Sequence, residues 1–124
     1  MSARQLEGLA ITFSNDRDAP IVDLQPRMEV DSWRLLRTPV GTLHLVTLRR
    51  LSEQGGTVRV TTRITVVDQV AGIVTTTSGR QYALVGPPED RQFERELLLN
   101  GAIKLGMGAS VDVSVLAWDQ VNIG

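Results

Sequence analysis

The side chains that could carry out chemistry are few in this sequence. There is no cysteine and only one histidine, His44. Thiolate nucleophiles, thiolate zinc sites and disulfides are therefore impossible, and a catalytic triad would have to use His44. The alternating pattern around His44 is typical of a strand and places it on the outer face of a sheet, so we interpret it as structural. We predict no catalytic residue and no metal site.

Three motifs resemble known kinds of functional site, but each lacks residues or a structural context that such a site requires. Asp16 and Asp18 flank an arginine, without the glycine and terminal glutamate of a calcium-binding EF-hand loop. The segment 106–110, Gly-Met-Gly-Ala-Ser, lacks the lysine of a phosphate-binding loop and precedes a strand instead of a helix. The carboxylates of residues 89–96 stand beside arginines, which is typical of a solvated helix face. We predict no cofactor, and the sequence favours a protein that is not an enzyme.

The composition is that of a globular protein with the size of one domain. The chain has 124 residues, 42% of them hydrophobic, and a net charge of −1. We expect one domain over residues 1–124, with a core large enough to fold without disulfides. The first residues lack the apolar stretch of a signal peptide, and no run approaches the roughly 20 apolar residues of a membrane span. We expect a cytoplasmic protein that does not interact with membranes.

Arginine is unevenly distributed along the chain. Twelve arginines accompany a single lysine, and seven of them lie between residues 26 and 63, where three carboxylates oppose them. A bias in codon composition is one explanation. The other is selection for planar, bidentate contacts, which arginine makes and lysine does not.

The elements that must position these side chains are mostly strands. Residues 42–51 and 57–67 alternate between apolar and polar side chains and are separated by the turn-forming segment 52–56. A turn centred on residues 54 and 55 sets Leu45 opposite Ile64. A second hairpin, over residues 70–77 and 80–85, sets Ile73 opposite Leu84. The pattern predicts an antiparallel meander over residues 42–85, with one apolar face lined by Leu43, Leu45, Ile64, Ile73 and Leu84.

Weaker strand patterns cover residues 9–14, 21–25, 28–36 and 111–117. One helix is expected at about residues 88–100, because two prolines and two acidic residues precede its apolar stripe and Asn100-Gly101 suits a helix end. We predict a mainly β (α+β) fold, in which the antiparallel meander is rolled into a small barrel or sandwich with the helix against it. An open sheet with the helix on one face is the alternative.

The predicted register gives the first hairpin an outer face that mixes arginine with apolar side chains. Arginine is enriched among the important residues of protein interfaces, and it also suits contacts with phosphates. Single-stranded nucleic acids are usually bound with exposed aromatic side chains, and this face has none. Burial of its apolar members under other strands, with the arginines as a rim, is the competing interpretation. The candidate binding residues are Arg50, Arg59, Arg63, Val46, Leu48 and Thr61.

We therefore expect a non-catalytic protein-binding or accessory domain, such as a small bacterial or phage factor, whose partner is another protein. A nucleic-acid-binding β domain that uses the same arginines is the first alternative. The second is a small enzyme or ligand carrier with its site near Tyr82, Trp118 and the 106–110 loop. A homo-oligomer is also expected, because a large sheet must cover its edges.

Overall fold

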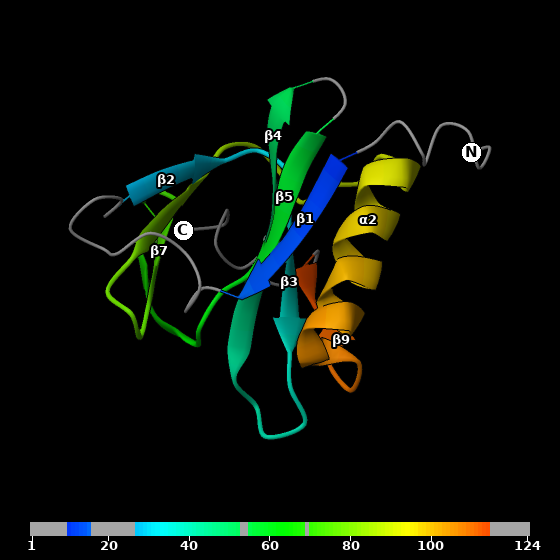
Figure 1. Cartoon of the computed structure of the whole chain (residues 1–124). Helices are drawn as coiled ribbons and strands as arrows, with labels where there is room; N and C mark the ends of the chain where they lie inside the picture. The colour runs from blue at the N-terminus through cyan, green and yellow to red at the C-terminus, as the bar shows by residue number, and fades with distance from the viewer. Residues whose placement is uncertain (1–9, 16–26, 53–54, 69, 115–124) are drawn as a thin grey trace.

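In the computed structural model, described for residues 10–15, 27–52, 55–68 and 70–114, the chain forms two β-sheets and an α-helix (Figure 1). Sheet A has the spatial order β1 (Ala10–Asn15), β5 (Gly55–Val60), β4 (Leu43–Ser52), β3 (Trp33–Arg37) and β9 (Val111–Asp112). Sheet B has the order β2 (Arg27–Val30), β8 (Gln81–Leu84), β7 (Ile73–Thr76) and β6 (Ile64–Asp68). Helix α2 (Gln92–Ala102) runs directly into a π-helical segment, η2 (Ile103–Met107). The prediction of a mainly β fold with one short helix is confirmed.

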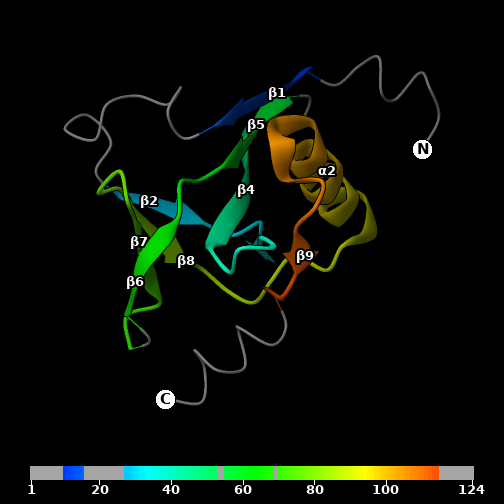
Figure 2. The same ribbon diagram turned by 90° about the horizontal axis from the view of Figure 1, so that it is seen from below.

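The elements stack as layers, with sheet A in the middle (Figure 2). One face of sheet A packs against α2 and the other against sheet B. The helix-side cluster contains the buried residues Leu36, Val46, Leu48, Val58, Val60, Leu98 and Ala102. The inter-sheet cluster contains Met28, Val30, Trp33, Leu35, Leu45, Val74 and Tyr82. The arrangement is sandwich-like, and the barrel alternative is wrong because, among the described strands, each sheet ends in two edge strands.

Strand β4 is buried on both faces. Leu45 belongs to the inter-sheet cluster and its neighbour Val46 to the helix-side cluster, and both are 0% exposed. Successive side chains of a strand point to opposite faces, so two consecutive buried residues require a cover on each side of the sheet. An antiparallel sheet with one wet face, as predicted for the meander, does not meet this requirement.

The register of the first hairpin differs from the prediction. Val46 lies opposite Val60 and Leu48 opposite Val58, whereas the predicted register set them opposite Arg63 and Thr61. The strand β5 begins at Gly55, and an irregularity between Arg50 and Ser52 shifts the pairing near the turn. Apolar residues therefore face one another across the hairpin beneath α2.

The predicted four-stranded meander is wrong, because the chain changes sheets after β5. Thr61 donates its N–H to Leu45 O at 2.9 Å, and its Oγ1 accepts the Leu45 N–H at 3.0 Å. A side-chain hydroxyl thus takes the place of the next backbone carbonyl in the β4 ladder. The main chain is free to leave sheet A, and β6 starts in sheet B at Ile64.

Sheet B keeps the predicted order of β6, β7 and β8 but not the predicted register. Ile73 lies opposite Ala83 instead of Leu84, and a bulge at Thr65 shifts β6 against β7. The apolar side chains are nevertheless placed largely as expected. Leu45 is in the inter-sheet cluster, and Leu43, Ile64 and Leu84 pack against it. Ile73 is half-buried and outside the cluster, because the one-residue change moves it to the other face.

Two pairings are parallel and were not predicted. Strand β1 adds to β5, and β2 adds to β8. The last strand pairs only Val111 and Asp112 with β3, and the rest of its predicted range beyond Ser114 lies outside the described residues. The same holds for the predicted strand at 21–25, for Asp16 to Asp18 and for Trp118.

Helix α2 begins at Gln92, later than predicted, because the Glu89 N–H is bound to Trp33 O at 2.9 Å and holds the preceding segment against β3. The helical backbone also passes through Gly101 and is broken at Gly106, where φ is 96°. Beyond α2, the ammonium of Lys104 lies 4.9 Å from the centroid of the Phe13 ring in β1. No helix in the described part of the chain is long and apolar enough to cross a membrane.

Gly101 sets the distance between α2 and sheet A. A Cβ at this position would lie 2.7 Å from Val58 Cγ1 and 2.9 Å from Phe13 Cε1. We expect Gly101→Ala to lower the free energy of unfolding by about 1–2 kcal/mol, since overpacking costs more than the helix propensity of alanine returns. Chemical denaturation measures this difference.

Gly108→Ala is the matched control, because its Cβ would meet only Ile103 Cγ2 at 3.8 Å, an ordinary contact. This variant should be as stable as the wild type or slightly more stable. A Gly101→Ala protein with wild-type stability would show that the helix does not approach the sheet this closely.

Candidate functional site

The structure does not bring the predicted binding residues together on one exposed face. Val46 and Leu48 are buried in the helix-side cluster. Thr61 is 3% exposed and forms the hydrogen bonds that end the pairing of β4 with β5. The predicted register was wrong in this region, and the face that it described as outer is covered by α2. Burial of the apolar members, the competing interpretation, is what the structure shows.

The three arginines of the predicted set are also separated. Arg59 is half-buried and points to sheet B, with Nη1 3.2 Å from the sulfur of Met28. Its Nε is buried and has no hydrogen-bond partner among the described residues. Arg63 is exposed and lies between β5 and β6, with its carbonyl accepting the Thr77 N–H at 2.9 Å. Arg50 of β4 pairs with Gly56 of β5, and its side chain is outside the described part of the structure.

His44 has hydrogen-bond partners on both ring nitrogens. Nδ1 lies 2.9 Å from Thr61 O, and Nε2 lies 3.1 Å from Thr42 Oγ1. A carbonyl can only accept, so Nδ1 donates to Thr61 O, and the second hydrogen bond joins Nε2 and the Thr42 hydroxyl. The ring therefore holds the end of β4 to the segment that leaves β5.

A buried polar group, Glu89, connects the start of α2 with the bend between β2 and β3. Its carboxylate is 6% exposed and accepts from Ser32 Oγ at 2.8 Å and from Arg91 Nη2 at 2.8 Å. Its carbonyl oxygen accepts from Arg34 Nη1 at 2.9 Å. Burial raises the pKa of the Glu89 carboxyl, but the hydrogen bonds from Arg91 and Ser32 outweigh this effect and hold it below its ordinary value. The same contact raises the pKa of Arg91.

A second polar chain starts from the same Arg34 and reaches β9. The guanidinium contacts Asp112 Oδ2 through Nη2 at 2.8 Å and through Nε at 2.9 Å. The other oxygen of Asp112 accepts from the backbone N–H and the hydroxyl of Ser114. The Ser114 hydroxyl oxygen in turn accepts the Leu35 N–H at 2.7 Å. These contacts attach the short strand β9 to β3.

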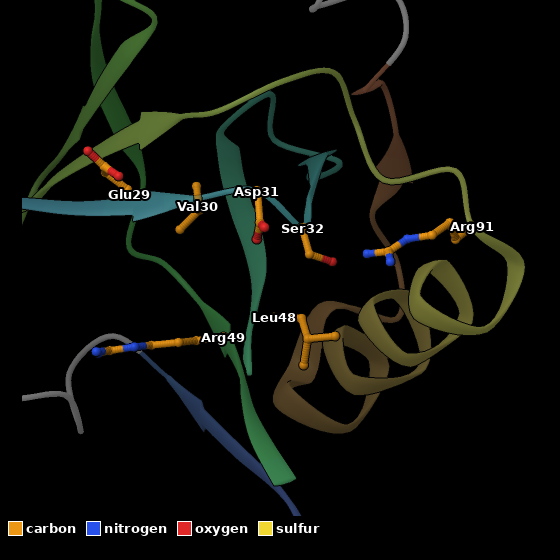
Figure 3. Close-up of a pocket in the computed structure, with 7 residues that line it drawn as sticks. All are labelled: Glu29, Val30, Asp31, Ser32, Leu48, Arg49 and Arg91. Atoms are coloured by element: carbon orange, nitrogen blue, oxygen red, sulfur yellow. The ribbon is translucent and has the colours of Figure 1, made fainter. Parts of the chain in front are cut away.

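A cleft of about 330 Å³ is lined in part by Ser32 and Arg91, the two side chains that donate to the Glu89 carboxylate. Its walls come from the end of β2 and the following bend, from β4 and from Arg91, and its lining residues are Glu29, Val30, Asp31, Ser32, Leu48, Arg49 and Arg91. The side chains of Ser32 and Arg91 point toward each other, whereas Arg49 points away from them (Figure 3). Ser32 and Arg91 both donate to the Glu89 carboxylate, and we call these two residues, Arg34 and Glu89 the Glu89 network. The polar groups at this end of the cleft are therefore hydrogen-bonded within the protein.

The described residues that line this cleft include two carboxylates, Glu29 and Asp31. No histidine is among the described lining residues, and the pKa of the nearby buried Glu89 carboxyl is lowered by its hydrogen bonds from Arg91 and Ser32. In the described ranges no three His, Asp or Glu residues gather to hold a metal ion. The ligand site proposed near Tyr82 is not seen at that residue, because Tyr82 is 0% exposed within the inter-sheet cluster.

Three of the large apolar side chains that are exposed in the described residues lie on the hairpin of β6 and β7, while Val40, Val85, Ile103 and Val111 are exposed elsewhere. Val66 is 57% exposed, Val67 42% and Val70 97%. Strand β6 is an edge of sheet B, so its outer side has no strand partner among the described residues. The arrangement places unpaired backbone groups beside exposed valines, with Arg63 just before the strand. We call residues 63–68 with Val70 the β6 edge.

Comparisons with known proteins add no assignment. No family model matches the chain, and neither a curated protein nor a solved structure matches it.

Sequence reasoning missed both the Glu89 network and the β6 edge. Glu89 was interpreted as a solvated helix residue, although Pro87 and Pro88 before it are a signal for extended backbone as well as for a helix start. The signal for the β6 edge was the pair Val66-Val67. Successive side chains of a strand point to opposite faces, so one of two consecutive apolar residues is exposed when one face of the sheet is in contact with solvent.

The Glu89 network predicts a pH-dependent stability. Because the pKa of Glu89 is lower in the folded than in the unfolded chain, its contribution is complete above the ordinary carboxyl pKa and is lost as the pH falls through the folded value. We expect Glu89→Gln to reduce the free energy of unfolding by about 1–2 kcal/mol at neutral pH. The difference from wild type should shrink on acidification, as followed by denaturation at several pH values.

Glu96→Gln removes the same charge from an exposed position on α2 and serves as the control. It should leave both the stability and its pH dependence close to wild type. A loss in Glu89→Gln that stays constant down to strongly acidic pH would contradict the assignment.

Proposed function

We propose that this protein is a non-catalytic protein-binding domain, which binds an extended segment of its partner along the β6 edge. The observation that carries the proposal is the coincidence of an unpaired strand edge with three exposed valines within five residues. A partner segment that adds to this edge forms main-chain hydrogen bonds with β6 and extends sheet B by one strand.

The side chains of the edge offer apolar contacts on both faces of that added strand. Val67 lies opposite the buried Val74 and therefore points to the inter-sheet side. Val66 lies opposite Thr75 and points to the outer side. An extended partner with apolar residues at alternate positions can cover one valine, and its flanking residues can cover the other.

The proposal retains the mixed arginine and apolar surface expected from the sequence, at a different place. Arg63 belongs to the predicted binding set, is exposed and precedes the edge strand. The separation of Arg59 from Arg63 removes the cluster on which nucleic-acid binding depended. A single exposed arginine beside valines is better suited to a protein partner.

A photoreactive amino acid tests this surface in the host cell. Placed at position 66, it should form crosslinks to another polypeptide, because the proposed partner strand lies within reach of this side chain. Position 40 is the control, since Val40 is 85% exposed but lies far along the chain, between β3 and β4. Gel electrophoresis and mass spectrometry identify the crosslinked products.

Crosslinks at position 66 and none at position 40 are the expected outcome. Crosslinks at position 40 alone, or equal yields at both positions, would mean that the partner binds elsewhere or that contact is non-specific.

A further inference from the structure

We infer that the strand bound at the β6 edge is β6 of a second copy of this chain, paired antiparallel about a two-fold axis. The inference rests on the proposed function and names its partner. It comes from the order of side chains along the edge, which is complementary to itself when reversed.

The faces of the edge residues follow from their pairing with β7. Ile64 and Val67 lie opposite Thr76 and Val74, which are buried, so both point to the inter-sheet side. Val66 and Asp68 lie opposite Thr75 and Ile73 and point to the outer side. Thr65 is the extra residue of the bulge.

Arg63 completes this alternation on the outer side. Its carbonyl accepts the Thr77 N–H, so it takes the position opposite Thr77, next along from the pair of Ile64 and Thr76. Leaving the bulged residue aside, the order along the strand is outer Arg63, inner Ile64, outer Val66, inner Val67 and outer Asp68.

Reversing this order about Val66 matches each of these five residues with a suitable partner. Val66 meets Val66 of the second copy, Ile64 meets Val67, and Arg63 meets Asp68. A two-fold axis perpendicular to the sheet keeps outer side chains on the outer face, so the register preserves the two faces of the sheet. Cross-strand pairs of apolar residues and of opposite charges both stabilise a sheet.

Other symmetric registers do not give this match. A centre at Ile64 brings Arg63 opposite Val66, and a centre at Val67 brings Asp68 opposite Val66. A centre between two residues places inner side chains opposite outer ones, which a continuous sheet does not allow. Only the register about Val66 pairs the two charges.

Both charged groups are available for the contact. Arg63 and Asp68 are exposed. The Oδ1 of Asp68 accepts the Ala71 N–H at 3.0 Å, which fixes the carboxylate at the end of the strand and leaves Oδ2 for a guanidinium. Each dimer contains this pair twice, once at each end of the joined strands.

Sedimentation of the purified full chain tests the inference through charge reversal. The wild type should dimerise in a concentration-dependent manner. Arg63→Asp and Asp68→Arg each place like charges opposite one another at both ends, and each should weaken the dimer by about tenfold. An equimolar mixture of the two variants should restore the association, because each copy then meets the opposite charge.

Three further variants keep the test decisive. Val66→Lys should weaken the dimer without touching the turn, in case Asp68→Arg does not fold. Arg37→Asp and Val40→Lys make the same changes at exposed positions remote from the edge in sequence, and they should dimerise like the wild type.

The outcomes separate this inference from the proposed function. A wild type that stays monomeric, while position 66 captures a different polypeptide in cells, overturns the second copy and leaves strand addition in place. A dimer that persists unchanged in Arg63→Asp and Val66→Lys uses another surface, and overturns the inference directly. Monomers with no crosslink at position 66 overturn both.

Discussion

The double burial of β4 is the constraint on which the rest of the architecture depends. Leu45 and Val46 are adjacent in sequence and belong to different clusters. One layer cannot cover both, so sheet A must have a sheet on one face and a helix on the other. The hairpin of β4 and β5 provides apolar residues to the helix, and β3 provides Trp33 and Leu35 to sheet B. The remaining elements are arranged around this central layer.

Two sets of polar contacts connect the layers and satisfy buried hydrogen-bonding groups at their boundaries. On one side of sheet A, Thr61 replaces a backbone carbonyl with its hydroxyl, and the chain can cross to sheet B without leaving the Leu45 N–H unpaired. On the other side, Arg34 links Glu89 and Asp112, so the segment before α2 and the strand β9 are fixed to the same residue of β3. Both connections satisfy buried polar groups where regular structure ends.

The sequence predicted the local strands and the helix better than it predicted their assembly into sheets. The hairpins and the helix were recognised because alternation and helical spacing depend on neighbouring residues, as at Phe93 and Leu97. The division of residues 42–85 between two sheets was missed because it depends on the hydrogen bond between the Thr61 hydroxyl and the Leu45 N–H. A single threonine does not change the alternation of apolar and polar residues, so the sequence pattern does not reveal this bond. The parallel partners of β1 and β2 were missed because they lie far away in sequence. The register error made Val46 and Leu48 seem exposed, although both are buried, whereas Arg63 is exposed as expected.

The two parallel pairings have a consequence for how the chain folds. Arg27 of β2 contacts Gln81 of β8 across 54 residues, and β1 reaches β5 from a similar distance. The antiparallel hairpins close short loops and can form early, whereas these two strands must wait for a large loop to close. Strands β1 and β2 are therefore expected to join their sheets after the hairpins have formed. The Lys104 contact with Phe13 forms only when β1 has docked, and it then stabilises the docked strand.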